Sequence, residues 1–148
     1  MDLTIIVFLL GGLFLGWSLG ANDAANVFGT AVGTRMIRFK TAAIVCGIFV
    51  ILGAVISGAG TTETLGKLGS ITALPGAFAA CIAAGLAVYL MTKSGLPVST
   101  TQAIVGAIVG WNIYTGSSTD IQILIIIIAT WVLCPVIAGL IEIGRAHV

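Results

Sequence analysis

The first apolar stretch constrains the fold most, because between Leu3 and Thr34 the only charged side chain is that of Asp23. A straight helix of this length would measure about 48 Å at 1.5 Å per residue. The hydrocarbon core of a bilayer is only about 30 Å thick. The stretch must therefore tilt strongly, break or leave the membrane. We expect a break near Gly20 to Asp23, where Asn22 and Asp23 can cap a new helix.

The composition of the whole chain agrees with a membrane protein. Of its 148 residues, 59% are hydrophobic and 7% are charged, and the mean hydropathy is +1.21. A soluble domain carries about 25% charged residues. The net charge of +1 argues against nucleic-acid binding, which needs a basic surface. No basic residue precedes the first apolar run, so we interpret it as a permanent membrane segment and not as a cleavable signal peptide.

Four further apolar segments follow, at about 41–57, 74–92, 98–113 and 121–143. A spanning helix needs about 20 apolar residues, and only the 98–113 segment is clearly shorter. At about 24 Å it either crosses a thinned region or forms one arm of a re-entrant hairpin. We therefore expect an all-α membrane protein with about five transmembrane helices, a broken first helix and a short fourth helix. Residues 1–148 would form a single transmembrane unit.

The basic residues predict the orientation of this unit. With five crossings, five of the six basic residues fall on one side: Arg35, Arg38, Lys40, Lys93 and Arg145. By the positive-inside rule that side is cytoplasmic. The N-terminus and the 58–73 loop would then lie outside and the C-terminus in the cytoplasm. The predicted location is the cell (inner) membrane, with multiple passes.

The first polar motif is GANDAANVFGT at residues 20–30. A helix broken there would free backbone carbonyls, which together with the Asp23 carboxylate suit a hard cation such as Na⁺ or H⁺. Free N–H groups and the carboxamides of Asn22 and Asn26 suit an oxyanion. The alternative is that Asp23 only caps a helix near the interface. A charge at depth costs a few kcal/mol, so it usually marks a pathway or a site.

The second polar motif is GLPVSTTQAIVGAIVG at residues 95–110. Ser99, Thr100 and Thr101 place three hydroxyls at the start of a helix, just after Pro97. Hydroxyls and free N–H groups at a helix N-terminus form a neutral cradle for an anion. The alternative is an ordinary capped helix with a GxxxG packing seam. Neither motif contains Lys or Arg, so an anion there would need neutral donors and a co-bound cation.

The sequence gives no support for an enzyme. Ser/His/Asp, Cys/His, Walker and GxGxxG patterns are all missing from the printed residues. The three cysteines lie singly in apolar segments, and we interpret them as packing residues. We expect no cofactor and no metal site beyond that of a transported cation.

The two motifs resemble the signatures of the inorganic phosphate transporter (PiT) family, sodium/phosphate symporter type. Residues 20–30 are similar to its GANDxANxFGT signature, residues 95–110 to its second signature, and Trp131–Pro135 to its W-x-x-x-P element. The resemblance implies cation-coupled uptake of inorganic phosphate by alternating access. Carried over position by position, it implies the following site residues: Asn22 and Asp23 for Na⁺, and Asn26, Ser99, Thr100 and Thr101 for phosphate.

The chain departs from the family pattern in two ways. Gln102 stands where the family usually has His, which removes a titratable group and favours Na⁺ over H⁺ as the coupled ion. Family members also contain two repeats in opposite orientation, and this chain contains one. An odd number of crossings makes a duplicated unit insert upside down. We therefore expect a fragment, or a unit that pairs with an inverted copy or partner, including a homo-oligomer.

Three other functions remain open at this point. The same scaffold could carry sulfate or another oxyanion, because hydroxyls and amides do not separate these ions well. The chain could also be a membrane fragment or assembly subunit that does not transport by itself. A passive channel is a third reading, but Asp23 within a broken helix favours an occluded site.

Overall fold

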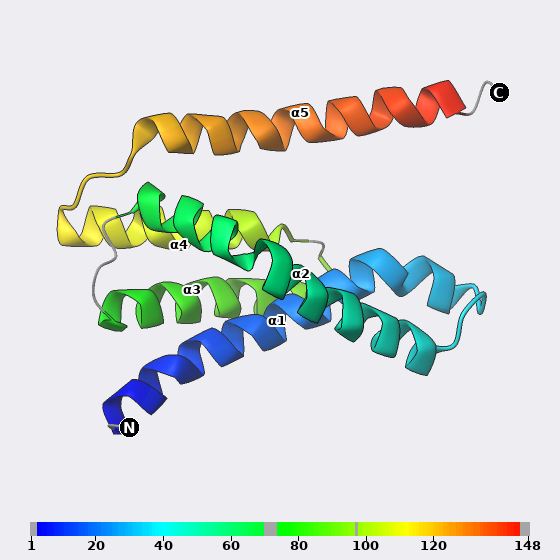
Figure 1. The fold of residues 1–148 in the computed structure, drawn as a ribbon, viewed down its shortest axis with the longest axis horizontal. Coiled ribbons are helices and arrows are strands. Elements are labelled where there is room, and N and C mark those ends of the chain that lie inside the picture. The colour runs from blue at the N-terminus through cyan, green and yellow to red at the C-terminus, as the bar shows by residue number, and fades with distance from the viewer. Residues whose placement is uncertain (1–2, 70–73, 97, 146–148) are drawn as a thin grey trace.

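The computed structural model describes residues 3–69, 74–96 and 98–145. This part of the chain forms five helices: α1 (Leu3–Gly33), α2 (Phe39–Leu68), α3 (Leu74–Lys93), α4 (Thr100–Thr115) and α5 (Ile121–Arg145). Consecutive helices run in opposite directions, and the two termini lie at opposite ends of the molecule (Figure 1). Four helices, α1, α2, α3 and α5, are long and apolar enough to cross a membrane. The expected all-α membrane fold is confirmed.

The predicted break in the first helix is wrong. α1 continues without interruption from Leu3 to Gly33, a length of about 46 Å. Asn22 does not cap the backbone, because its side chain makes hydrogen bonds to residues outside α1 instead. The helix ends at Gly33, and two residues later Arg35 has a φ of 62°, in the left-handed region. The freed backbone carbonyls that we expected near Asp23 therefore do not exist.

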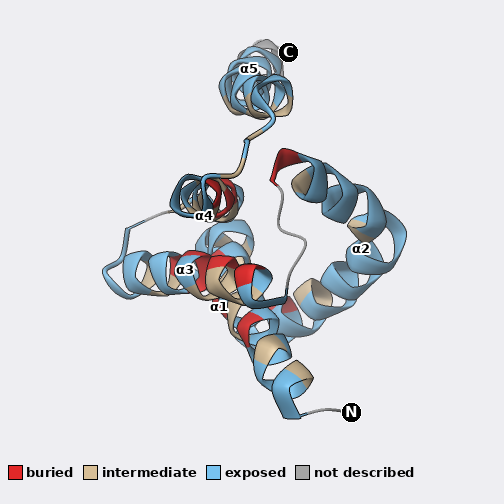
Figure 2. Cartoon of the chain, turned by 90° about the vertical axis from the view of Figure 1, so that its left-hand side faces the viewer, coloured by how far each residue is buried: buried red, intermediate tan, exposed pale blue. Residues whose placement is uncertain are grey.

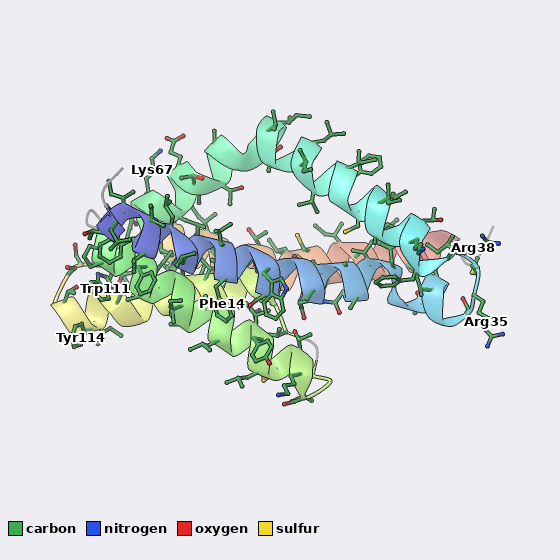
Figure 3. The ribbon with its side chains drawn as sticks, turned by 90° about the horizontal axis from the view of Figure 1, so that it is seen from below. Phe14, Arg35, Arg38, Lys67, Trp111 and Tyr114 are labelled. Carbon is green, nitrogen blue, oxygen red and sulfur yellow. The ribbon has the colours of Figure 1, made fainter. Side chains whose placement is uncertain are left out.

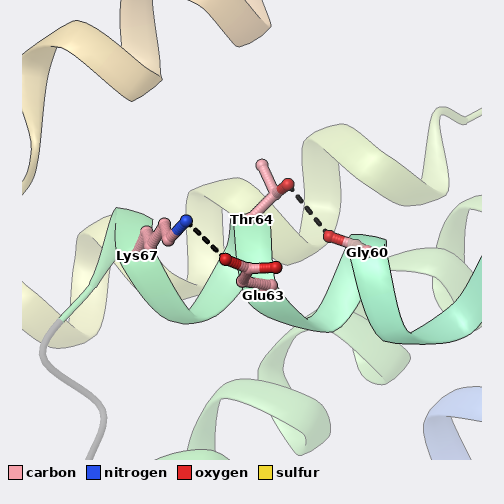
Figure 4. Close-up of polar contacts among 4 residues, drawn as sticks. All are labelled: Gly60, Glu63, Thr64 and Lys67. Atoms are coloured by element: carbon pink, nitrogen blue, oxygen red, sulfur yellow. Dashed lines mark hydrogen bonds and ion pairs between the residues drawn. The ribbon is translucent and has the colours of Figure 1, made fainter.

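The second helix is longer than predicted. The segment expected at 41–57 extends to Leu68, so most of the predicted 58–73 loop is helical, while residues 70–73 lie outside the described part. Threonine hydroxyls here bond carbonyls one turn back, as Thr64 does with Gly60 at 3.0 Å. Lys67 and Glu63 form an ion pair four residues apart at 2.5 Å (Figure 4). The ion pair supports the helix in a stretch whose composition resembles a loop. The threonine hydroxyls there are satisfied within the helix.

The fourth helix contains 16 residues, two positions later than the expected 98–113. Its last turn, with Trp111 and Tyr114, lies at the same end of the molecule as Lys67 (Figure 3). Arg35 and Arg38 lie at the opposite end. α4 therefore runs in the opposite direction to both α3 and α5, which is the alternation expected of five consecutive membrane crossings. The 74–92 and 121–143 segments are confirmed to within two residues at each end.

Close glycine contacts hold α1, α3 and α4 together. α3 packs along α1 on one side and along α4 on the other. A Cβ atom on Gly85 would lie 2.8 Å from the ring of Phe14 on α1, and one on Gly76 would lie 2.8 Å from the ring of Trp111 on α4. In lipid, where there is no strong hydrophobic drive between helices, such close approach supplies the packing energy.

A second apolar cluster attaches the remaining helices. Leu68 at the end of α2 is buried with Val105 and Ile108 of α4, and residues from the first half of α5 pack against them. Figure 2 shows that buried residues concentrate on α1, α3, α4 and the end of α2, whereas the described residues of α5 are exposed or intermediate. Nine of the exposed side chains on α2 and ten of those on α5 are large and apolar. These two faces are suited to contact lipid or other membrane helices.

The glycine contacts predict a specific loss of stability. Gly85→Val should destabilise the protein by about 1–3 kcal/mol, because the added methyl groups overlap the Phe14 ring. Gly12→Val is the matched control, since nothing lies within 4 Å of a Cβ at Gly12. Unfolding of detergent-solubilised protein, followed by circular dichroism, measures both. Equal stability of the two variants would show that the α1–α3 contact is not tightly packed.

Candidate functional site

The two polar motifs meet at the side chain of Asn22. This residue faces inward from α1 and is 3% exposed. Its Nδ2 donates to the carbonyl oxygen of Val98, just before α4, at 3.1 Å. Its Oδ1 accepts from the Thr92 hydroxyl, at the end of α3, at 3.2 Å. One buried amide therefore connects the first motif to α3 and to the second motif.

Asp23 lies beside this amide but points away from the helix interface. Asn22 Nδ2 also donates to Asp23 Oδ1 at 3.1 Å, so both amide hydrogens are used. Asp23 itself is exposed, as is Asn26 three residues later. Residues three apart on a helix share a face, so Asp23 and Asn26 present a carboxylate and a carboxamide together. Because α1 is unbroken, a cation here would use side-chain oxygens and not freed carbonyls.

Ser99 caps α4, as the second motif predicts. Its hydroxyl oxygen accepts from the backbone N–H of Gln102 at 3.3 Å. Pro97, expected before this helix, lies outside the described residues. Ser99 is exposed and Thr100 is half-buried. The N–H groups in the first turn of a helix have no partner within the helix, so this end of α4 keeps the donors and dipole that favour an anion.

Thr101 lines a different space, a cavity of about 420 Å³ between α2, α4 and α5. Three α2 hydroxyl residues, Ser57, Thr61 and Thr64, line the same cavity. Asn26 does not line it, so the structure does not bring all four predicted phosphate residues together. The α2 hydroxyls were missed because we expected a loop there. Their spacing of four and three residues is that of one helix face and could have revealed them.

The cavity beside the first motif is apolar. It has a volume of about 550 Å³ between the second half of α1 and the start of α2. Its walls are mostly small residues, and five of these belong to the motif itself: Gly20, Ala21, Ala24, Ala25 and Gly29. The motif therefore divides its residues: Asn22 faces α3, Asp23 and Asn26 are exposed, and the small residues form this groove.

The thiols and acidic groups form no metal centre in the described part of the chain. No group of three or more His, Cys, Asp or Glu side chains there could hold a metal ion. Cys46, Cys81 and Cys134 are free thiols.

Comparison with known proteins gives consistent matches. The model of the Phosphate transporter family matches residues 19–146. Three relatives carry the name "Putative phosphate permease". That of Thermococcus kodakarensis is 35% identical over 95% of this chain and 37% of its own length. Those of Pyrococcus furiosus and Chlamydia pneumoniae are each 36% identical, over 94% and 91% of this chain and 36% and 34% of their own lengths. The chain thus spans little more than a third of these relatives. No solved structure matches it.

The hydrogen bonds of Asn22 predict how the stability of the protein and its hydrogen exchange change when this side chain is removed. Asn22→Ala should destabilise the protein by about 1–3 kcal/mol, because the buried partners lose their hydrogen bonds. Hydrogen–deuterium exchange should also speed up in the connection between α3 and α4. Asn26→Ala, at an exposed position on the same helix, is the control and should change neither quantity. Unchanged exchange in Asn22→Ala would mean that the amide does not hold this connection.

Proposed function

Because the chain belongs to the phosphate transporter family, we propose that it contributes one repeat of a secondary transporter that carries inorganic phosphate together with Na⁺. The observation that carries this proposal is the Asn22 amide, which joins the acidic motif of α1 to the hydroxyl motif before α4. A cation site and an anion site linked by one buried side chain have the arrangement that coupled transport needs.

In this proposal the cation binds at Asp23 and phosphate binds at neutral donors. Asp23 is the only charged residue in either motif, so it attracts Na⁺, and Asn22, assigned to the same site, holds the Asp23 carboxylate by a hydrogen bond. Ser99, Thr100 and Thr101 supply hydroxyl donors for phosphate at the start of α4, and Asn26 supplies an amide donor from α1, outside the cavity that Thr101 lines. The bound cation offsets the phosphate charge that no Lys or Arg neutralises. Neutral donors also keep binding weak enough for release, as reversible transport requires.

Na⁺ fits this site better than H⁺. Gln102, at the start of α4, cannot titrate, and its N–H is already bonded to Ser99. A proton-coupled cycle would rest on Asp23 alone. With Na⁺, the second oxygen of the Asp23 carboxylate, which accepts no hydrogen bond from Asn22, is available as a ligand.

The remaining parts of the proposal concern assembly. The exposed apolar faces of α2 and α5 would contact a second repeat in inverted orientation, either a copy of this chain or another part of a longer protein. Alternating access would then arise from movement of one repeat against the other. The end with Arg35, Arg38 and Lys93 would face the cytoplasm across the cell (inner) membrane.

Uptake of radiolabelled phosphate into proteoliposomes tests this function. We expect an inward Na⁺ gradient to drive uptake and Asp23→Asn to abolish it, because the variant removes the only carboxylate of the two motifs. Reconstitution inserts the chain in both orientations, so an inverted copy is available. Glu63→Gln is the control: Glu63 is exposed, pairs with Lys67 and belongs to neither motif. Uptake that persists in Asp23→Asn would contradict the assignment, and competition by excess sulfate would indicate a different oxyanion.

The cavity beside α2 predicts a role for Thr101 in phosphate affinity. Thr101→Val should raise the half-saturating phosphate concentration at least about tenfold, the effect of losing one hydrogen bond to a charged group. Thr130→Val is the matched control, because the Thr130 hydroxyl is exposed and donates to Ile126 within α5. Phosphate titration of uptake measures both variants. Equal affinities would remove Thr101 from the phosphate site.

A further inference from the structure

Thr92 uses its hydroxyl differently from the other helical hydroxyls of this protein. A threonine or serine in a membrane helix commonly donates to the carbonyl one turn back. Six residues here do so: Thr34, Thr62, Thr64, Ser94, Thr115 and Thr130. The Thr92 hydroxyl instead donates across the helix interface to Asn22 Oδ1. A hydroxyl has one hydrogen, so this bond replaces the one within α3.

Asn22 directs its amide nitrogen and its amide oxygen at different partners. An amide has two donor hydrogens on nitrogen and two acceptor sites on oxygen. Nδ2 donates to two groups that can only accept, the Val98 carbonyl and the Asp23 carboxylate, each at 3.1 Å. These acceptors direct Oδ1 toward α3, where the Thr92 hydroxyl donates to it at 3.2 Å. Thr92 therefore supplies the partner that holds the amide oxygen in this orientation.

We propose that Thr92 is a positioning residue for the cation step: its hydroxyl holds the Asn22 amide in place, and the amide in turn holds the Asp23 carboxylate and the segment before α4. This proposal depends on the proposed function only in assuming that a cation binds at Asp23. The orientation of Asn22 follows from the contacts themselves. Thr92 lies outside both polar motifs and contacts the cation site only through Asn22.

Three variants separate orientation from packing. Thr92→Val has nearly the same shape but lacks the hydroxyl, whereas Thr92→Ser keeps it. Ser94→Ala removes a neighbouring hydroxyl that bonds only within its own turn, to Leu90. If Thr92 acts by its hydrogen bond, only the valine variant should alter the site. A packing role would instead make the serine variant the more damaging of the two, because it loses a methyl group.

Nuclear magnetic resonance of the side-chain amides gives a readout that does not depend on transport. The chain contains three asparagines, Asn22, Asn26 and Asn112, so selective ¹⁵N labelling gives three resolvable groups. In Thr92→Val the Asn22 amide hydrogens should exchange with solvent about three- to tenfold faster, the range for one lost neutral hydrogen bond. Asn112, which donates to Thr119 at the other end of α4, should not change. Unchanged Asn22 exchange would overturn the proposal.

A Na⁺ titration of the same signals tests the link to the cation. Thr92→Val should raise the half-saturating Na⁺ concentration about three- to tenfold, while Thr92→Ser and Ser94→Ala should match the wild type. In an Asn22→Ala background the valine substitution should have no further effect on Na⁺-driven uptake, because Thr92 acts through Asn22. Additive losses of uptake in the double variant would show that Thr92 does not act through Asn22.

If Na⁺ changes no amide signal in the wild type, the assignment of the cation to this site fails. The hydrogen-exchange rates of the Asn22 amide still decide whether Thr92 holds it.

Discussion

The rest of the site depends on one interaction, the hydrogen bonding of a buried amide in a lipid-facing protein. An amide placed in an apolar environment without partners costs several kcal/mol. Asn22 has partners from three segments: Asp23 beside it, Thr92 on α3 and Val98 before α4. These bonds fix the lateral position of α1 against α3 and the start of α4. The candidate ion-binding groups are placed as a consequence.

Small residues and polar residues have separate tasks in this fold. Glycines permit aromatic rings to enter the α1–α3 and α3–α4 interfaces, as Phe14 does at Gly85. Six Ser and Thr hydroxyls donate to a carbonyl one turn back along the chain and leave the interface chemistry unchanged. The exceptions, such as Thr92, are therefore informative, because a hydroxyl that bonds across an interface specifies one relative position of two helices. In lipid, where apolar contacts discriminate weakly between positions, that specificity has few other sources.

Much of the fold could be predicted from the sequence, and the errors have physical causes. The apolar segments at 74–92 and 121–143 matched helices closely because length and hydropathy suffice for spanning segments. Near Asp23 the local signal for a cap was outweighed by tertiary hydrogen bonds of Asn22, which no local pattern contains. At 58–68 a composition of glycine and threonine suggested a loop, but in lipid these residues are compatible with a helix. The motifs indicated the candidate site residues. The hydrogen bond between Asn22 and Thr92, 70 positions apart, could be recognised only in the folded structure.

The unbroken course of α1 has an electrical consequence. Asp23 lies ten residues before the last residue of the helix, a rise of about 15 Å, or roughly half the hydrocarbon thickness. With the end of α1 at the membrane surface, a cation bound at Asp23 as proposed would cross about half of the membrane voltage, equivalent to about 1 kcal/mol at 100 mV. Occupancy of the carboxylate would then respond to the membrane potential as well as to ion concentration. Because α1 is continuous, the resting membrane potential would then contribute to the driving force for cation binding at Asp23, the one charged residue of this helix.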